Sequence, residues 1–230
     1  MRLAAPSILV TTQADEIIAR KDVELVVEAA SQDTVKALAF RILEAGKNML
    51  IMSTGALTDD RFYADLERKA QEKHVRIYLP SGAICGLDGV RSASIQEIRS
   101  VILTTTKHPI SLEGAPYIKE KQIDLRSLAE PTTVFIGTAR EAIKGFPMNV
   151  NVAACLSLAG IGADKTMVRI VADPSASKTQ HEINVVGDFG ELYTRVRNVV
   201  HPENPRTSFL AALSAVRTLK GIAEPIQIRA

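Results

Sequence analysis

Short apolar runs alternate with amphipathic segments through the first third of the chain. Three runs predict buried strands, at residues 23–28, 49–52 and 75–79. After the first run, apolar residues recur at i, i+3, i+4 and i+7 from Val35, and Asp59 places an acid where a second helix would begin. This order of strands and helices predicts half of a doubly wound parallel sheet. A short strand at residues 8–10 and a weak helix at residues 14–19 are expected ahead of it.

The three predicted strands all end in small or hydroxyl-bearing residues, at positions 29–31, 53–55 and 81–83. Parallel strands end at the same edge of a sheet, and in open α/β sheets this carboxyl edge is where ligands bind. We therefore expect Ala30, Ser53 and Ala83 to lie along one edge and to face a bound cofactor, because small residues let a flat ring approach the backbone. The alternative is that these residues only form turns and pack.

The second half of the chain predicts a mixed α+β arrangement. Strands are expected at residues 101–107, 133–137, 167–172, 182–186 and 191–197, helices at 139–144 and 152–159, and a loop with short helical pieces at 109–128. Successive strands with short connections are expected to pair antiparallel. A last helix is expected to begin at Pro205, to return to the first half, and to turn four residues inward: Leu210, Leu213, Val216 and Leu219. The predicted domains are residues 1–99 with 205–230, and residues 100–204.

Composition narrows the class of protein. Hydrophobic residues make up 46% of the 230 positions and charged residues 23%, which is typical of a globular protein with a core. The net charge is +2 without a basic block, and aromatic residues make up 4%, so no nucleic-acid partner is expected. No apolar run approaches the roughly 20 residues that span a bilayer, so no membrane association is expected. Cys85 and Cys155 lie far apart, which fits two reduced thiols in a cytoplasmic protein.

The histidines are the candidate acid–base or metal-binding side chains. None belongs to an H-x-x-H or C-x-x-C pairing, so no metal site is expected. His181 enters a predicted strand after a polar loop, where an imidazole can act as a general acid or base or can be a structural histidine. His201 lies beside a proline, where a turn is expected. Asn149 and Asn151 flank a predicted helix start, and Asn151 can cap the helix while Asn149 remains available for another role.

Two nucleotide-binding motifs are absent from the sequence. Neither the dinucleotide fingerprint G-x-G-x-x-G nor a phosphate-binding loop occurs. The nearest approach, the G-I-G at residues 160–162, follows a predicted helix and indicates a helix end. The 22 residues ahead of Val23 are too few for the strand, glycine turn, helix and strand that usually open a dinucleotide-binding domain.

A series of short motifs between Val23 and the C-terminus resembles the L-aspartate dehydrogenase family. The motifs are E-A-A-S-Q from Glu28, S-T-G-A from Ser53, S-G-A-I from Ser81, N-V-N-V-A-A from Asn149, H-E from His181, G-D-F-G-E from Gly187 and E-N-P-R-T-S from Glu203. Each is short, but their order and spacing are specific. The resemblance implies an α/β fold, in which a Rossmann-like parallel sheet, incomplete at the N-terminus, joins a mixed α+β domain for substrate binding and dimerisation.

The resemblance also implies an activity and a site. The activity is NAD- or NADP-dependent oxidation of L-aspartate to iminoaspartate, then oxaloacetate and ammonia, with a link to NAD biosynthesis through quinolinate synthase. Residues 1–99 with 205–230 would bind NAD(P), residues 100–204 would bind the substrate, and a homo-oligomer, in the simplest case a homodimer, is expected. By position, Ala83 and Asn149 match cofactor contacts near the nicotinamide, and His181 matches the catalytic histidine.

The sequence departs from the family pattern in one respect. The family carries a glycine-rich strand, turn and helix ahead of the segment that matches Val23, and the present sequence begins after it. Because such a turn contacts the pyrophosphate, we expect the 230-residue chain to bind the cofactor more weakly than an extended chain, with a smaller effect on folding. The alternative function is a non-catalytic ligand-binding or interaction subunit on the same fold.

Overall fold

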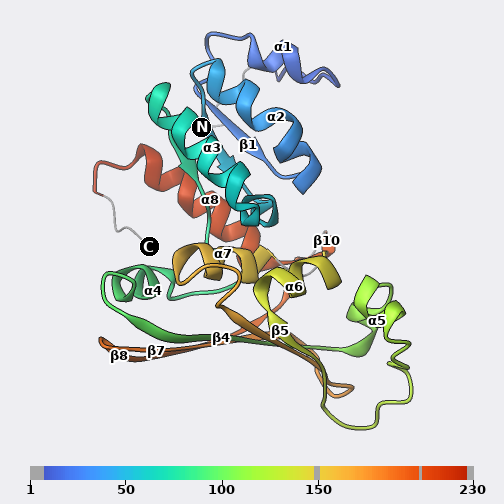
Figure 1. Ribbon diagram of the computed structural model, residues 1–230. Helices are drawn as coiled ribbons and strands as arrows, with labels where there is room; N and C mark the ends of the chain where they lie inside the picture. The colour runs from blue at the N-terminus through green and yellow to red at the C-terminus, as the bar shows by residue number, and fades with distance from the viewer. Residues whose placement is uncertain (1–7, 148–150, 202–203, 227–230) are drawn as a thin grey trace, which may run out of the picture.

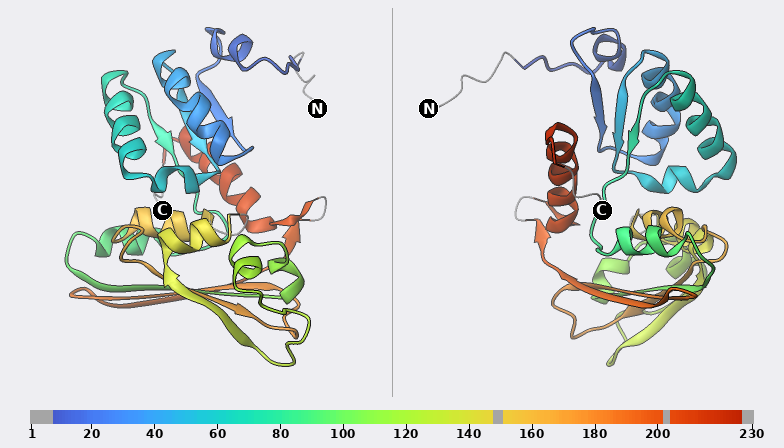
Figure 2. Two further views of the ribbon diagram at one scale, coloured as in Figure 1. Left: turned by 45° about the vertical axis from the view of Figure 1, so that its right-hand side comes forward. Right: turned by 90° about the vertical axis from the view of Figure 1, so that its left-hand side faces the viewer.

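The computed structural model describes residues 8–147, 151–201 and 204–226. The first part of the chain forms a three-stranded sheet, and the second part forms a five-stranded sheet with helices on one of its faces (Figure 1). These helices lie between the two sheets (Figure 2). Within the described ranges, no helix is long and apolar enough to cross a membrane.

The three-stranded sheet is parallel, in the order β1 (Leu25–Glu28), β2 (Asn48–Ile51) and β3 (Ile77–Tyr78). The strands are joined by α2 (Gln32–Glu44), the 3-10 helix η1 (Thr54–Thr58) and α3 (Asp60–Glu72), and they are preceded by α1 (Ala14–Ile18). The predicted alternation of strands and helices is confirmed. The strand predicted at residues 8–10 is wrong: no described strand pairs with this segment, and its side chains are exposed.

Local sequence explains where the helices of this sheet begin. Ser31 Oγ accepts a hydrogen bond from Thr34 N (3.1 Å), and Asp59 Oδ1 accepts one from Phe62 N (3.1 Å), so each side chain satisfies a backbone donor at a helix start. The apolar faces of α2 and α3 then bury a core with β2, whose members include Val35, Ala39, Ile42, Leu43, Met49, Ile51 and Leu66. Full burial of a residue such as Leu43 contributes about 1.5–3 kcal/mol to stability.

The five-stranded sheet runs in the spatial order β5-β6-β4-β7-β8. Its strands are β4 (Ile98–Lys107), β5 (Thr132–Thr138), β6 (Met167–Ala172), β7 (Thr179–Gly187) and β8 (Gly190–Asn198). Only the β4–β6 pair is parallel among these neighbours. One face is covered by α4 (Leu87–Ala93), α6 (Ala139–Gly145) and α7 (Asn151–Ala159), while η2 (Pro109–Leu112) and α5 (Pro116–Glu120) follow β4 (Figure 1).

The pairing predicted between β6 and β7 is wrong. These strands follow each other in sequence, but β4 lies between them and pairs with both. The central place suits β4 because its residues Val101, Leu103 and Thr105 are all buried on the helix-covered face. The other expected antiparallel pair, β7 with β8, is present and turns between Gly187 and Gly190.

The last helix begins later than predicted. Pro205 lies in β10 (Asn204–Ser208), which pairs with β9 (Val200–His201), and α8 (Phe209–Ala223) begins only after Ser208. A proline has no N–H to donate, and it is tolerated in a short edge strand such as β10. The predicted position of Pro205 at the start of a helix is therefore wrong.

The inward face predicted for this helix is correct for Leu210 and Leu219, which are half-buried, and wrong for Leu213 and Val216. Leu213 and Val216 are 47% and 49% exposed, because no described element covers that side of α8. The helix does return toward the first half of the chain, where the Gly82 N–H donates to Ser214 Oγ at 3.0 Å (Figure 2). The domain boundaries at residues 99/100 and 204/205 stay predictions.

Candidate functional site

The strands of the three-stranded sheet end in loops at residues 29–31, 52–55 and 79–83, which form its carboxyl edge. The Glu28 carboxylate ties the first two loops together. Its Oε1 accepts hydrogen bonds from Ala30 N (2.7 Å) and Ser53 Oγ (2.9 Å), and its Oε2 accepts one from Ser53 N (3.0 Å). Glu28 is only 5% exposed, so these donors replace the water that a carboxylate would otherwise bind. A buried acid therefore fixes the positions of Ala30 and Ser53.

Residues from the second half of the chain hold the third loop. The Cys155 thiol on α7 lies within hydrogen-bonding distance of both Pro80 O (3.6 Å) and Thr54 Oγ1 (3.3 Å), and so links the third loop to the second. Burial raises the pKa of this thiol to about 11, so it stays protonated and can donate. Asn198, the last residue of β8, donates from Nδ2 to Ala83 O (2.9 Å). The two sheets therefore share the loop that carries Ala83.

The first turn of α7 connects the carboxyl edge to β4. At its start, Asn151 Oδ1 accepts a hydrogen bond from Gly55 N at 3.4 Å. Two residues later, Ala153 lines a cavity of about 10 Å³ together with Thr105 and Lys107 of β4. The distance from the carboxyl edge to the helix-covered face of the five-stranded sheet is thus spanned by one turn of helix.

His181 lies on this covered face of the sheet. It is directly opposite Thr105 in the β4–β7 ladder, and its Nδ1 lies 3.0 Å from Thr105 Oγ1. Only 3% of the residue is exposed. Burial, together with the positive charge of Lys107, lowers the pKa of His181 to about 3, so the imidazole is neutral at neutral pH. Burial also lowers the pKa of Lys107 itself, to about 8.

The Ala83 loop meets the same end of the sheet. Asn198, which binds Ala83 O, is opposite Thr179 in the β7–β8 ladder, two residues before His181. Residues that lie far apart in the sequence are therefore brought to the same region of the fold. Ala30, Ser53 and Ala83 form a shelf of small residues on the carboxyl edge, and the shelf is connected through α7 and Asn198 to the sheet that carries the buried, neutral imidazole. This arrangement can hold a flat ligand on the shelf and exchange a proton next to it.

Comparison with known proteins gives the family. Residues 88–222 match the family described as "Aspartate dehydrogenase, C-terminal", and residues 3–80 match the one described as "Homoserine dehydrogenase, NAD binding domain". The L-aspartate dehydrogenase of Methanosarcina barkeri is 50% identical over 208 residues, which cover 90% of this chain and 77% of that protein. The chain belongs to the aspartate dehydrogenase family.

Two further relatives support this assignment. The L-aspartate dehydrogenase of Nitrosopumilus maritimus is 47% identical over 89% of this chain and 75% of that protein. The crystal structure of aspartate dehydrogenase from Thermotoga maritima matches with a TM-score of 0.75 and 33% identity, covering 90% of this chain and 79% of that one. The family and the α/β fold, with a Rossmann-like parallel sheet and a mixed second part, were both predicted from the sequence and are confirmed.

In this member of the aspartate dehydrogenase family, the structure places the predicted site residues on two sides of α7. Ala30, Ser53 and Ala83 lie in the three loops of the carboxyl edge, and His181 lies on the covered face of the five-stranded sheet. Asn149 falls outside the described residues. The roles assigned to these residues stay predictions.

Sequence reasoning missed the residues that position the site. The sequence placed Thr105 and Lys107 in a predicted strand, Glu28 at a strand end where a family motif begins, and Asn198 just after a predicted strand, and no role was expected for the four side chains. A signal was present for two of them, because Glu28 and Lys107 are charged residues that end apolar strands. Thr105 and Asn198 carried no such signal, since their importance depends on the strand that lies beside them.

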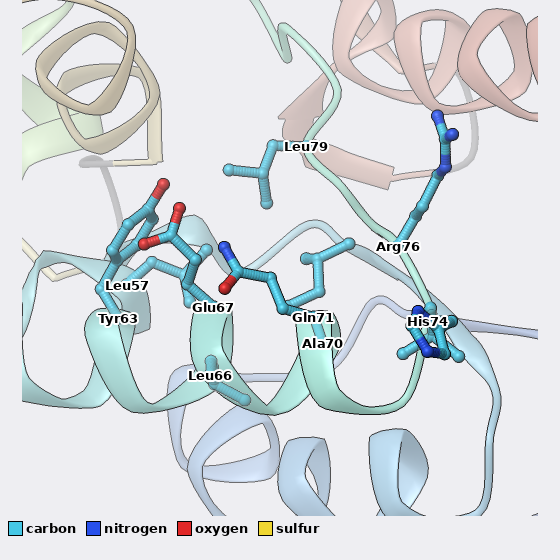
Figure 3. A pocket seen from close by; sticks show the side chains of 11 residues that line it. Leu57, Tyr63, Leu66, Glu67, Ala70, Gln71, His74, Arg76 and Leu79 are labelled. Carbon is cyan, nitrogen blue, oxygen red and sulfur yellow. The ribbon is translucent and has the colours of Figure 1, made fainter.

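A pocket larger than the cavity beside Thr105 lies elsewhere in the described residues. It has a volume of about 660 Å³ between α3 and β3, where Tyr63, Glu67 and Gln71 point from α3 toward Leu79 (Figure 3). None of the four described site residues, Ala30, Ser53, Ala83 and His181, lines it. Across the ranges that the structure describes, no group of three or more His, Cys, Asp and Glu residues is placed to hold a metal ion.

The burial of neutral His181 predicts a pH dependence of folding stability. The pKa is about 3 in the folded chain and 6.5 as the unperturbed value, so between these pH values the unfolded chain binds the extra proton. The stabilisation is therefore complete above pH 6.5 and is lost as the pH falls toward 3. From pH 6 to pH 5, His181 alone should lower the free energy of unfolding by about 1 kcal/mol.

Urea denaturation of His181→Gln at pH 6 and pH 5 tests this prediction. The variant should lose that part of the pH dependence, whatever its absolute stability. His74→Asn is the matched control, because His74 is exposed and asparagine tolerates its φ of +54°. An unchanged pH dependence in His181→Gln would show that the imidazole is not buried in its neutral form.

The three hydrogen bonds that the Glu28 carboxylate accepts predict a large loss of stability when it is replaced by an amide of the same shape. In Glu28→Gln, either orientation of the amide turns its NH₂ toward a backbone N–H, that of Ser53 or that of Ala30. One buried donor then lacks an acceptor, and we expect a loss of about 1–3 kcal/mol in urea denaturation. Glu24→Gln, at an exposed position just before β1, should stay within about 0.5 kcal/mol of the original chain. Equal stability of the two variants would show that the hydrogen bonds to Glu28 do not stabilise the fold.

Proposed function

We propose that this chain oxidises L-aspartate with NAD or NADP as the hydride acceptor, giving iminoaspartate and then oxaloacetate and ammonia. The observation that carries the proposal is the position of His181: the buried, neutral imidazole is paired with Thr105, which lines a cavity with Ala153 of α7, and the start of α7 binds the loops of small residues at the carboxyl edge. The family assignment supports the same reaction, since the relatives are named L-aspartate dehydrogenases.

The residues of the carboxyl edge fit a nicotinamide cofactor. Ala30, Ser53 and Ala83 have small side chains, and a Cβ atom added at Gly82, where φ is +66°, would meet no atom within 4 Å. Space therefore lies open beside the backbone at this edge, where a planar ring can approach it. When bound, the cofactor supplies the acceptor for the hydride that leaves the substrate α-carbon. We assign Ala30, Ser53, Ala83 and Asn149 to cofactor binding.

His181 is the proposed acid–base group. If Nδ1 carries the hydrogen and donates to Thr105 Oγ1, Nε2 keeps a lone pair for the substrate. Nε2 can then accept a proton from the substrate ammonium, or from the water that hydrolyses the imine. The buried position of the imidazole excludes bulk water from this proton transfer.

Replacement of the imidazole tests the proposed function directly. His181→Ala should lower the rate of L-aspartate-dependent cofactor reduction by roughly 10²–10⁴-fold, the usual contribution of a positioned proton-transfer group. His201→Ala is the control and should change the rate little. If the original chain binds L-aspartate but reduces neither NAD nor NADP, the protein is a binding subunit and the proposal is wrong.

The position of His181 changes the pH profile expected from the sequence. An exposed imidazole predicts a rate that rises with pH near neutrality as the ring loses its proton. With its pKa lowered to about 3, His181 is already neutral throughout the neutral range. The limb of kcat/KM that depends on His181 should therefore lie well below pH 6, because kcat/KM reports the free enzyme.

Thr105 should act on the reaction through His181. Thr105→Val removes the oxygen that holds Nδ1 and leaves the buried ring free to adopt the other tautomer. We expect kcat to fall roughly 10–100-fold, equivalent to the loss of one buried hydrogen bond, while the KM for the cofactor is unchanged. Thr105→Ser keeps the hydroxyl and should restore most of kcat. Similar kcat values for the two variants would contradict this role.

The remaining assignments are proposals that the reaction and the structure support. Residues 1–99 with 205–230 bind the cofactor, and residues 100–204 bind the substrate. Iminoaspartate hydrolyses readily, which supports a partner that consumes it, quinolinate synthase.

A homo-oligomer, in the simplest case a homodimer, is supported by exposed apolar residues on the helix-free face of the five-stranded sheet: Ile102, Ile136, Met167 and Tyr193. Two free thiols, Cys85 and Cys155, support a cytoplasmic location.

A further inference from the structure

Lys107 lies next to the His181 site. It is the last residue of β4, two positions after Thr105, and residues two apart on a strand point to the same face. Both side chains line the small cavity under α7, which confirms that Lys107 lies on the helix-covered face. Its backbone is fixed by pairing with Ala172 of β6 and by the hydrogen bond from Asp173 N to Lys107 O (2.9 Å).

Thr105 connects Lys107 to His181, because it lines the cavity together with Lys107 and its Oγ1 lies 3.0 Å from His181 Nδ1. The positive charge of Lys107 contributes, after burial, to the low pKa of the imidazole. Lys107 is itself largely withdrawn from water, and this burial disfavours its charged form. A cation in such surroundings interacts strongly with an anion that reaches it, because little water screens the attraction.

L-Aspartate carries two carboxylates and one ammonium. We propose that the Lys107 ammonium binds a carboxylate of the substrate beside His181, and that it thereby selects an acidic amino acid. The inference rests on the proposed function and adds a residue that positions the substrate. A lysine suits this task because its compact charge accepts a carboxylate oxygen without a fixed bidentate geometry.

The same contact orients the substrate for proton transfer. A positive Lys107 attracts the carboxylate and repels the substrate ammonium, which leaves the ammonium to face the uncharged imidazole of His181. The bound carboxylate also offsets the charge of Lys107, which removes part of the influence that lowers the pKa of His181. The imidazole therefore becomes a stronger base when the substrate is in place.

Steady-state kinetics of two variants test the inference. Lys107→Met keeps a long apolar side chain but removes the charge, and it should raise the KM for L-aspartate roughly 10–100-fold, as expected for the loss of one charged hydrogen bond. The KM for the cofactor should change less than about twofold, because Lys107 does not lie on the carboxyl edge. Lys107→Arg keeps the charge and should recover part of the affinity. Lys119→Met, on the exposed side of α5, is the matched control and should resemble the original chain.

A binding measurement separates this inference from the proposed function. Succinate has both carboxylates of L-aspartate but no ammonium, so it can occupy the site without reaction. Calorimetric titration should show succinate binding to the original chain and to Lys119→Met, and binding at least about tenfold weaker to Lys107→Met. If the original chain lacks dehydrogenase activity but this pattern holds, the proposed function fails and the carboxylate site stands. Equal succinate affinity in all three proteins, or an equal rise in KM for L-aspartate and for the cofactor in Lys107→Met, would overturn the inference.

Discussion

The first turn of α7 packs between the two sheets, and the geometry of the candidate site depends on it. On one side, the Thr54 hydroxyl donates to Asn151 O (3.1 Å), and the Gly55 N–H donates to Asn151 Oδ1. On the other side, Ala153 packs over β4 next to Thr105. The small side chains of this turn let the helix approach both sheets closely. A larger residue at Ala153 would push the carboxyl edge away from His181, because protein interiors have little free space.

Buried polar groups then set the chemistry on both sides of this turn. The Glu28 carboxylate is surrounded by three donors from the carboxyl edge, so its charge is stabilised and the edge becomes rigid. The surroundings of His181 have the opposite effect: burial and the positive charge of Lys107 both disfavour the charged form of its imidazole. The result is a fixed shelf for a flat ligand beside an imidazole that is held neutral. Proton transfer and hydride transfer need these two features within a few ångströms of each other.

Part of this structure was predictable because it depends on short-range patterns. Apolar runs with small terminal residues correctly predicted β1 to β3 and the common edge of Ala30, Ser53 and Ala83. The strands of the second half were located as well, but the insertion of β4 between β6 and β7 was not. The strand order depends on which strands pair with the two edges of β4, and the order of strands along the sequence does not determine this. The start of α8 was missed because Pro205 fits a short edge strand as well as a first helical turn.

The sequence by itself determined the family, the α/β class and the identity of His181 as a candidate base, since these follow from motifs, periodicity and the chemistry of one side chain. Only the tertiary structure decided the environment of that side chain. The β4–β7 register places Thr105 opposite His181, and the strand alternation brings Lys107 to the same face. The pKa of an imidazole depends on the water it loses and on the charges beside it, and both are properties of the folded surroundings. For this reason His181 was recognisable in the sequence, whereas the residues that control it were not.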